Sequence, residues 1–207
     1  MFFLTGLRQV HNAFHGVLGL PRTATDWVML ILSVLMLGPM HAVQVCHLRH
    51  HRFCLSEQDV EGRVAKRGAW RALAIGPLYP AQLHYTGWRH AGARRRRWIG
   101  AELLPSVVVI FLALGVEVAD WWTYHVLAMS CGQCLTGFCA VWTVHRGASS
   151  QPFHARTIRN RITAALTYDV FYHAEHHMYP TVPTRNLAVL ARRLDVAQPG
   201  MQPKMVF

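Results

Sequence analysis

Two long apolar runs lie in the middle of the chain, and basic segments flank them. Residues 99–116 form an apolar run with one charge, Glu102, and residues 121–144 contain no Asp, Glu, Lys or Arg. A helix needs about 20 apolar residues to cross a bilayer, so these runs predict a transmembrane helical hairpin. A shorter apolar run, 27–40, is interrupted by a Gly-Pro pair and predicts an interfacial, re-entrant or buried helix.

The charges around the hairpin predict its orientation. The turn between the two runs carries Glu117 and Asp120 and no basic residue, and every arginine lies outside the hairpin. Loops rich in Lys and Arg stay on the cytoplasmic side, so we expect the turn to face away from the cytoplasm. The sequence therefore predicts an all-α integral membrane protein, with a transmembrane helical hairpin and further interfacial helices.

The remaining segments predict shorter elements around this hairpin. Asp26 is placed to cap the helix that follows it. Residues 57–71 form a polar stretch with three acidic and four basic residues. The other expected elements are the end of a helix at 1–10, helices at 163–172 and 186–194, irregular or interfacial structure at 70–88, a solvated basic loop at 94–97 and a tail from about 196.

Composition favours a membrane protein over a nucleic-acid-binding protein. Of the 207 residues, 52% are hydrophobic and 15% are charged, whereas about a quarter of the residues in soluble domains are charged. The net charge of +11 comes mainly from arginine. Because the arginines lie between apolar runs, we expect them to face the cytoplasmic leaflet of a bilayer and expect no nucleic acid partner. The length suits a single domain over residues 1–207.

Histidines form three clusters that are spaced for one face of a helix. The clusters are His11 and His15, then His47, His50 and His51, and finally His173, His176 and His177, and an isolated His145 follows the second apolar run. Residues at i, i+3 and i+4 are neighbours on a helix surface. Two crossings return the chain to the side from which it started, so the predicted topology places all these histidines on the cytoplasmic side.

These nine histidines predict a site for two metal ions. Imidazole binds iron, zinc, copper and nickel, and nine candidates are too many for one tetrahedral ion. A structural zinc site commonly includes cysteine, whereas these clusters leave positions open, which favours oxygen-activating iron. Asp169 and Glu175 are candidates to orient the third cluster. The histidines interpreted as surface or interfacial residues are His41, His84, His90, His125 and His154.

The three clusters resemble the histidine boxes of the membrane fatty acid desaturase superfamily. In order they read HNAFH, HLRHH and HAEHHMYPTVP. The third is the most specific, because the family often follows HxxHH with an aliphatic or aromatic residue and then prolines. The family also places an isolated histidine after its last span, which His145 matches. Carotenoid ketolases have three similar boxes.

The resemblance implies a membrane enzyme that holds two irons on the cytoplasmic side through the eight histidines of the three clusters and the isolated His145. Such enzymes use O2 to remove hydrogen from an unactivated C–H bond of a lipid or acyl substrate. A separate electron-transfer protein of the ferredoxin or cytochrome b5 type supplies the electrons. The first interpretation is a fatty acid desaturase that introduces a C=C bond into an acyl-lipid or acyl-CoA.

Other functions stay open at this point. A carotenoid ketolase or hydroxylase and a lipid hydroxylase use the same chemistry, and a non-catalytic metal-binding membrane protein is an alternative of another class. The family usually has a helical hairpin before its first box, whereas ten residues precede His11. We therefore expect that the N-terminal hairpin is missing, either because the start is truncated or because the chain is a minimal variant.

Overall fold

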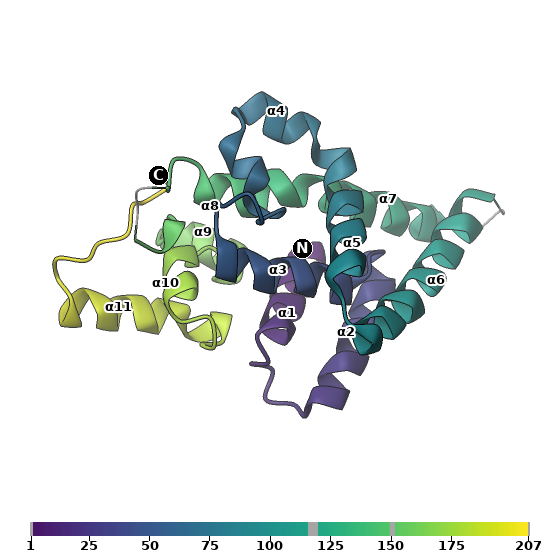
Figure 1. The fold of residues 1–207 in the computed structure, drawn as a ribbon, viewed down its shortest axis with the longest axis horizontal. Coiled ribbons are helices and arrows are strands. Elements are labelled where there is room, and N and C mark those ends of the chain that lie inside the picture. Colours follow the sequence, from purple (N-terminus) through teal and green to yellow (C-terminus); the bar gives the residue numbers. More distant parts are fainter. Residues whose placement is uncertain (1, 116–119, 150–151, 207) are drawn as a thin grey trace.

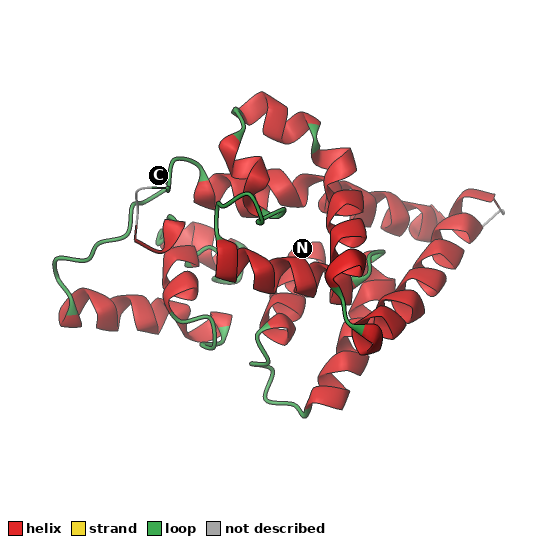
Figure 2. Cartoon of the chain, in the orientation of Figure 1, coloured by secondary structure: helices red, strands yellow, loops and turns green. Residues whose placement is uncertain are grey.

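The fold is helical throughout the part of the chain that the structure describes. The computed structural model describes residues 2–115, 120–149 and 152–206, and these ranges contain helices and loops without a strand (Figure 2). One isolated bridge between Thr157 and Met205 joins the C-terminal segment to the loop that follows the apolar runs. The all-α prediction is therefore confirmed.

A helix that carries several histidines occupies the centre of the molecule. Figure 1 shows α3 (Met40–Phe53) in the middle, with α6 (Ala93–Gly115) and α7 (Asp120–Thr136) extending to one side. On the opposite side lie α10 (His173–Met178) and α11 (Leu187–Ala197). The central helix α3 thus lies between the apolar helices and the C-terminal part that carries the third histidine cluster.

A sharp bend joins α2 (Arg22–Met36) to α3, and the direction of the helix axis changes by 108° there. Leu37 has a left-handed conformation with φ 59°, which ends α2. Pro39 then precedes α3, and its ring suits the start of a helix. The interruption predicted at the Gly-Pro pair lies at this bend, and it separates an apolar helix from the helix that carries the second cluster.

Two predictions about helix starts are wrong. Asp26 does not cap a helix, because α2 already begins at Arg22 after Pro21 and Asp26 lies within its second turn. Residues 94–97 are not a loop, because they form the first turn of α6. Arginine has a high helix propensity, so a basic run is compatible with the start of a long helix.

The predicted hairpin is helical along both apolar runs. The helix α7 continues through a π-helical segment, η3 (Gly137–Trp142), into α8 (Thr143–His145). Within the described ranges, this helix of 26 residues is the one that is long and apolar enough to cross a membrane. The bent pair of α2 and α3 also qualifies if the two helices are counted as one broken span. The first predicted span lies in α6, but Val116 and Glu117 fall outside the described residues.

The segment 70–88 is more regular than predicted. It contains α4 (Ala69–Ala74), η2 (Gly76–Leu78) and α5 (Tyr79–His90). Its prolines stand in the first turns of η2 and α5. A proline there loses no helical hydrogen bond, so it begins a helix rather than preventing one.

The helix predicted at 163–172 is interrupted. The helix α9 (Arg161–Leu166) ends early, and Tyr168 and Asp169 follow with φ of 53° and 62°. Left-handed residues cannot continue a right-handed helix. The helix α11 confirms the one expected at 186–194, and α1 (Phe2–Phe14) extends the one expected at 1–10. The remaining short turns are η1 (Gly62–Lys66), η4 (Pro152–His154) and η5 (Thr184–Asn186).

A buried carboxylate holds the bend between α2 and α3. The side chain of Glu102 in α6 is fully buried. Its Oε1 accepts hydrogen bonds from Ser33 Oγ at 2.8 Å and from His41 Nδ1 at 2.6 Å, and its Oε2 accepts from the backbone N–H of His41 at 3.0 Å. Glu102 therefore satisfies donors in the first turn of α3. The interpretation of His41 as a surface or interfacial residue is wrong, because His41 is only 1% exposed.

We predict that Glu102→Leu lowers the stability of the protein by about 3 kcal/mol, because it leaves the buried His41 side chain and backbone donors unpaired. The unfolding midpoint of the detergent-solubilised protein should fall by about 6–12 °C. A matched control is Glu57→Gln, which changes a side chain that is 93% exposed. Equal midpoints for the two variants would show that Glu102 does not support the bend.

Candidate metal centre

The nine histidines that the sequence singled out converge from four parts of the chain. They come from the end of α1, from α3, from α8 and from α10. Two groups each have ring nitrogens that all lie within 4.8 Å of one another: His11, His15, His47 and His176 form the first group, and His50, His145, His173 and His177 form the second. The structure therefore brings all three clusters and the isolated histidine to one place.

His51 lies between the two groups. Its Nε2 is 3.0 Å from the Nε2 of His176 and 3.2 Å from the Nε2 of His47, both in the first group. Its ring also stacks on that of His177 in the second group, with the ring centroids 4.4 Å apart. The two groups are thus adjacent, and His51 contacts both.

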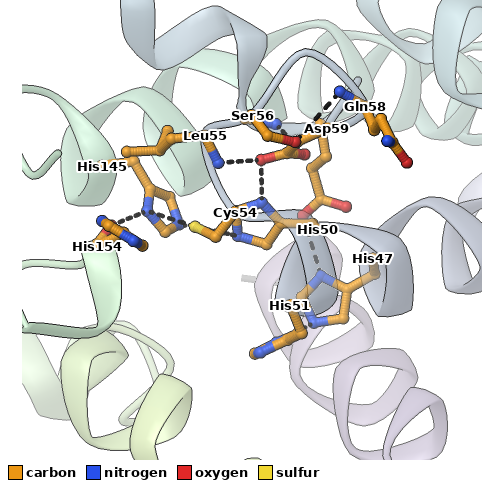
Figure 3. Close-up of polar contacts among 12 residues, drawn as sticks. His47, His50, His51, Cys54, Leu55, Ser56, Gln58, Asp59, His145 and His154 are labelled. Carbon is orange, nitrogen blue, oxygen red and sulfur yellow. Dashed lines mark hydrogen bonds and ion pairs between the residues drawn. The ribbon is translucent and has the colours of Figure 1, made fainter.

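Hydrogen bonds determine which nitrogen of several rings carries the proton. His50 Nδ1 lies 2.9 Å from a carboxylate oxygen of Asp59, and His145 Nδ1 lies 2.7 Å from the backbone carbonyl of His154 (Figure 3). Both acceptors lack a proton to give, so each Nδ1 must donate. In the neutral ring the Nε2 then carries a lone pair. His47 Nδ1 lies 3.0 Å from a carboxyl oxygen of Glu61.

The Nε2 nitrogens of the second group lie close together. His50 Nε2 and His145 Nε2 are 3.1 Å apart, and His145 Nε2 and His173 Nε2 are 2.8 Å apart. Two neutral imidazoles with facing lone pairs repel, whereas a cation between them is attracted by both. Metal–nitrogen bonds of about 2.0–2.1 Å place neighbouring ligand nitrogens about 3 Å apart. The donor set and its spacing therefore fit a bound metal ion.

Burial keeps the histidines of α10, and those at or just after the end of α1, electrically neutral. The neutral imidazole is the form that binds metal. Desolvation, followed by the neighbouring histidines, lowers the pKa of His11, His173, His176 and His177 well below the usual 6.5. Burial also lowers the pKa of His15 to about 4. These rings are neutral at pH 7, and a neutral ring nitrogen is required for coordination.

The two acids that orient histidines were missed by the sequence analysis. Although burial opposes it, the hydrogen bond with His50 lowers the pKa of Asp59, so this carboxylate stays ionised. Burial raises the pKa of Glu61 to about 7. Both acids lie in the stretch 57–71, which has a polar composition. The apolar residues within this stretch were the available signal that it packs into the interior, since Val64 and Ala65 are buried.

The acids proposed from the sequence to orient the third cluster have other roles. Glu175 is fully buried and accepts hydrogen bonds from Thr157 Oγ1 at 2.6 Å and Arg159 Nε at 2.7 Å. It therefore attaches α10 to the loop before it. For Asp169, the described residues include no histidine hydrogen-bonded to its carboxylate. Asp169 has a left-handed backbone, and burial raises its pKa.

The side chains of the other unclustered histidines belong to neither group. His90 and His154 are exposed, as expected. His125 donates from Nε2 to the carbonyl of Leu35. His84 is half-buried, and its Nε2 is buried beside an apolar cavity.

Comparison with known proteins identifies the family. The model of the fatty acid desaturase family matches residues 1–206. The chain belongs to the fatty acid desaturase family. It is also 28% identical over 198 residues to a β-carotene ketolase from Paracoccus sp. (strain N81106 / MBIC 01143), a match that covers 90% of this chain and 74% of the ketolase. No solved structure matches the chain.

We predict that Asp59→Asn weakens metal retention by about 10–100-fold, because His50 loses the charged partner that fixes its tautomer. Iron per protein after a chelator challenge measures this loss. Glu57→Gln, two residues away and exposed, should retain iron as the unchanged protein does. Equal retention in both variants would contradict the role given to Asp59.

We also predict that the metal-free protein loses stability on acidification. An unfolded chain has histidine pKa values near 6.5, whereas the pKa of His15 in the fold is about 4. Between these values only the unfolded chain binds the proton, so stability falls as the pH drops from about 6.5 towards 4, by up to about 1.4 kcal/mol per pH unit for each such histidine. The unfolding midpoint should therefore be at least several degrees lower at pH 5 than at pH 7.5, and an unchanged midpoint would contradict the buried neutral rings.

Proposed function

We propose that the protein is a membrane-bound, O2-dependent di-iron oxidoreductase that oxidises a C–H bond of a long apolar molecule, with a carotenoid as its first candidate substrate. The observation that supports this most directly is the pair of adjacent four-histidine groups. His11, His15, His47 and His176 would hold one iron, and His50, His145, His173 and His177 would hold the other. When bound, the irons supply the activation of O2 that removes hydrogen from an unactivated carbon.

An apolar cavity reaches both histidine groups. It has a volume of about 70 Å³, and its walls include His11 and His47 of the first group and His173 of the second. A second cavity of about 40 Å³ adjoins it. The side chains shared by the two walls are Leu7, Phe14, Val43, Tyr79, Leu83 and Thr136. These walls suit an apolar group and exclude water from the histidines.

Two observations point to different substrates. The relative named as a β-carotene ketolase favours oxidation of a carotenoid ring. The family match favours the second candidate, a fatty acid desaturase acting on an acyl chain. Both reactions need a neutral, apolar carbon beside the same histidines, so the geometry of the two groups serves either substrate.

The proposal also includes the membrane and the electron donor. We expect the helix Asp120–His145 to cross the bilayer with His145 at its cytoplasmic end, paired with α6 as a hairpin. The outer side of α6 carries exposed apolar residues that suit lipid, among them Leu104, Val107 and Phe111. A separate protein of the ferredoxin or cytochrome b5 type would supply electrons.

The test is expression of the full chain in a bacterial host that makes β-carotene and supplies an electron donor. We expect an oxygenated carotenoid in these cells. His173→Ala should lower its yield at least 100-fold, whereas His90→Ala, which changes an exposed histidine outside both groups, should leave it unchanged. Carotenoids and fatty acids are profiled from the same culture.

Other outcomes separate the alternatives. A new acyl double bond without an oxygenated carotenoid would replace the carotenoid assignment with a desaturase. Iron-loaded protein without either product would favour a non-catalytic metal-binding protein.

A further inference from the structure

A third cavity, separate from the two apolar ones, opens where α2 and α6 begin. Its volume is about 430 Å³, and it is lined by three arginines, Arg22, Arg94 and Arg95. The wall also includes Asp26, which is largely buried, and His15 from the first histidine group. This size is in the range of ligand pockets, and the function proposed above makes no use of it.

The cavity carries an excess of positive charge. Asp26 is the one acidic residue in its wall, and this carboxylate is already paired with Arg94 and with His41 Nε2. Neither Arg22 nor Arg95 forms an ion pair with a described residue. Burial and the nearby charge of Arg22 both lower the pKa of Arg95. Two guanidinium groups are therefore available to bind an anion.

The helix ends at the cavity add to this preference. The helix α2 starts after Pro21 without a side-chain cap, and α6 starts at Ala93 beside the cavity. The N-terminus of a helix carries a partial positive charge and unpaired N–H groups. Arginine, moreover, matches the geometry of phosphate oxygens with two parallel N–H donors.

The surroundings of the cavity indicate its level in a membrane. Trp98 lines the cavity and packs edge-to-face against Trp27, with ring centroids 5.3 Å apart. Tryptophan is enriched at the level of lipid headgroups. Further along the two helices, which lie side by side in Figure 1, the exposed side chains are apolar. They include Ile31 and Leu35 of α2 and Leu103, Leu104 and Val107 of α6.

We propose that this cavity binds the phosphate of an anionic phospholipid, whose acyl chains lie along the exposed apolar side chains of α2 and α6. The lipid is a bound structural partner and not the substrate, so this proposal does not depend on which carbon the enzyme oxidises. His15 and the start of α2 line the same cavity. An occupying phosphate therefore stabilises the connection between the first histidine group and α2.

The test compares three forms of the full chain in phosphatidylcholine nanodiscs that contain increasing fractions of phosphatidylglycerol. The cavity variant is Arg22→Gln/Arg95→Gln, and Arg94 is left in place because it pairs with Asp26. The matched control is Arg89→Gln/Arg97→Gln, which removes the same charge from exposed arginines outside the cavity. The measured quantity is the rise in unfolding midpoint with phosphatidylglycerol, which gives an apparent affinity.

We expect the cavity variant to bind phosphatidylglycerol about 25-fold more weakly than the unchanged protein, from about fivefold for each of the two arginines near an anionic surface. The control should stay within about threefold. If the double variant does not fold, Arg95→Gln alone should show the fivefold loss, and Arg22→Lys/Arg95→Lys should restore most of the binding.

Two results would overturn the proposal. Equal losses in the cavity variant and the control would show a general effect of surface charge. Inorganic phosphate that stabilises the protein as well as the lipid does, in the same phosphatidylcholine nanodiscs, would show a site for a free anion instead of a lipid.

Discussion

The constraint on which this structure depends is the convergence of imidazole nitrogens in a buried space. His50 Nε2 and His145 Nε2 lie 3.1 Å apart, and Asp59 and the carbonyl of His154 accept the Nδ1 protons of these two rings. This arrangement is favourable only with positive charge between the rings. At this pair a proton can supply the charge, because, although burial opposes it, the hydrogen bond with Asp59 raises the pKa of His50. Burial lowers the pKa of His173 and His177 in the same group, so these rings stay neutral. A metal ion among these nitrogens would replace the proton and supply the positive charge that the buried neutral rings lack.

The helices outside the centre determine where these nitrogens point. The helix α3 carries three of the histidines, and its first turn is attached to α6 through Glu102. His145 follows the π-helical segment η3, in which Gly137 lies so close to the ring of Tyr79 that an added Cβ would be 2.9 Å from it. A π-helical turn changes the direction in which the next residues face. The apolar helices are thus part of the geometry of the centre and not only an anchor for it.

The sequence predicted which histidines share a helix face, because a spacing of three and four residues is a local property of a helix. It predicted that the clusters meet only through the expected two crossings of the membrane. It did not predict the partners of these histidines. Asp59 lies nine residues after His50 in a stretch of polar composition, and only the folded loop brings the carboxylate back to the ring. Likewise, Glu102 reaches His41 across 61 positions, and no periodic pattern records that contact. The left-handed conformation of Tyr168, which ends the helix predicted at 163–172, has no signal in composition either.

Glu61 shows how metal binding and protonation are coupled in such a centre. Burial raises the pKa of this carboxyl to about 7, so near neutral pH it is partly protonated while the centre lacks metal. Its partner His47 belongs to the first group, whose four nitrogens lie within 4.8 Å of one another. A divalent ion there would bring positive charge close to Glu61 and favour the ionised form. Metal uptake near pH 7 would then release a proton from Glu61 and strengthen its hydrogen bond to His47, so the ion would stabilise the same contact that orients its ligand.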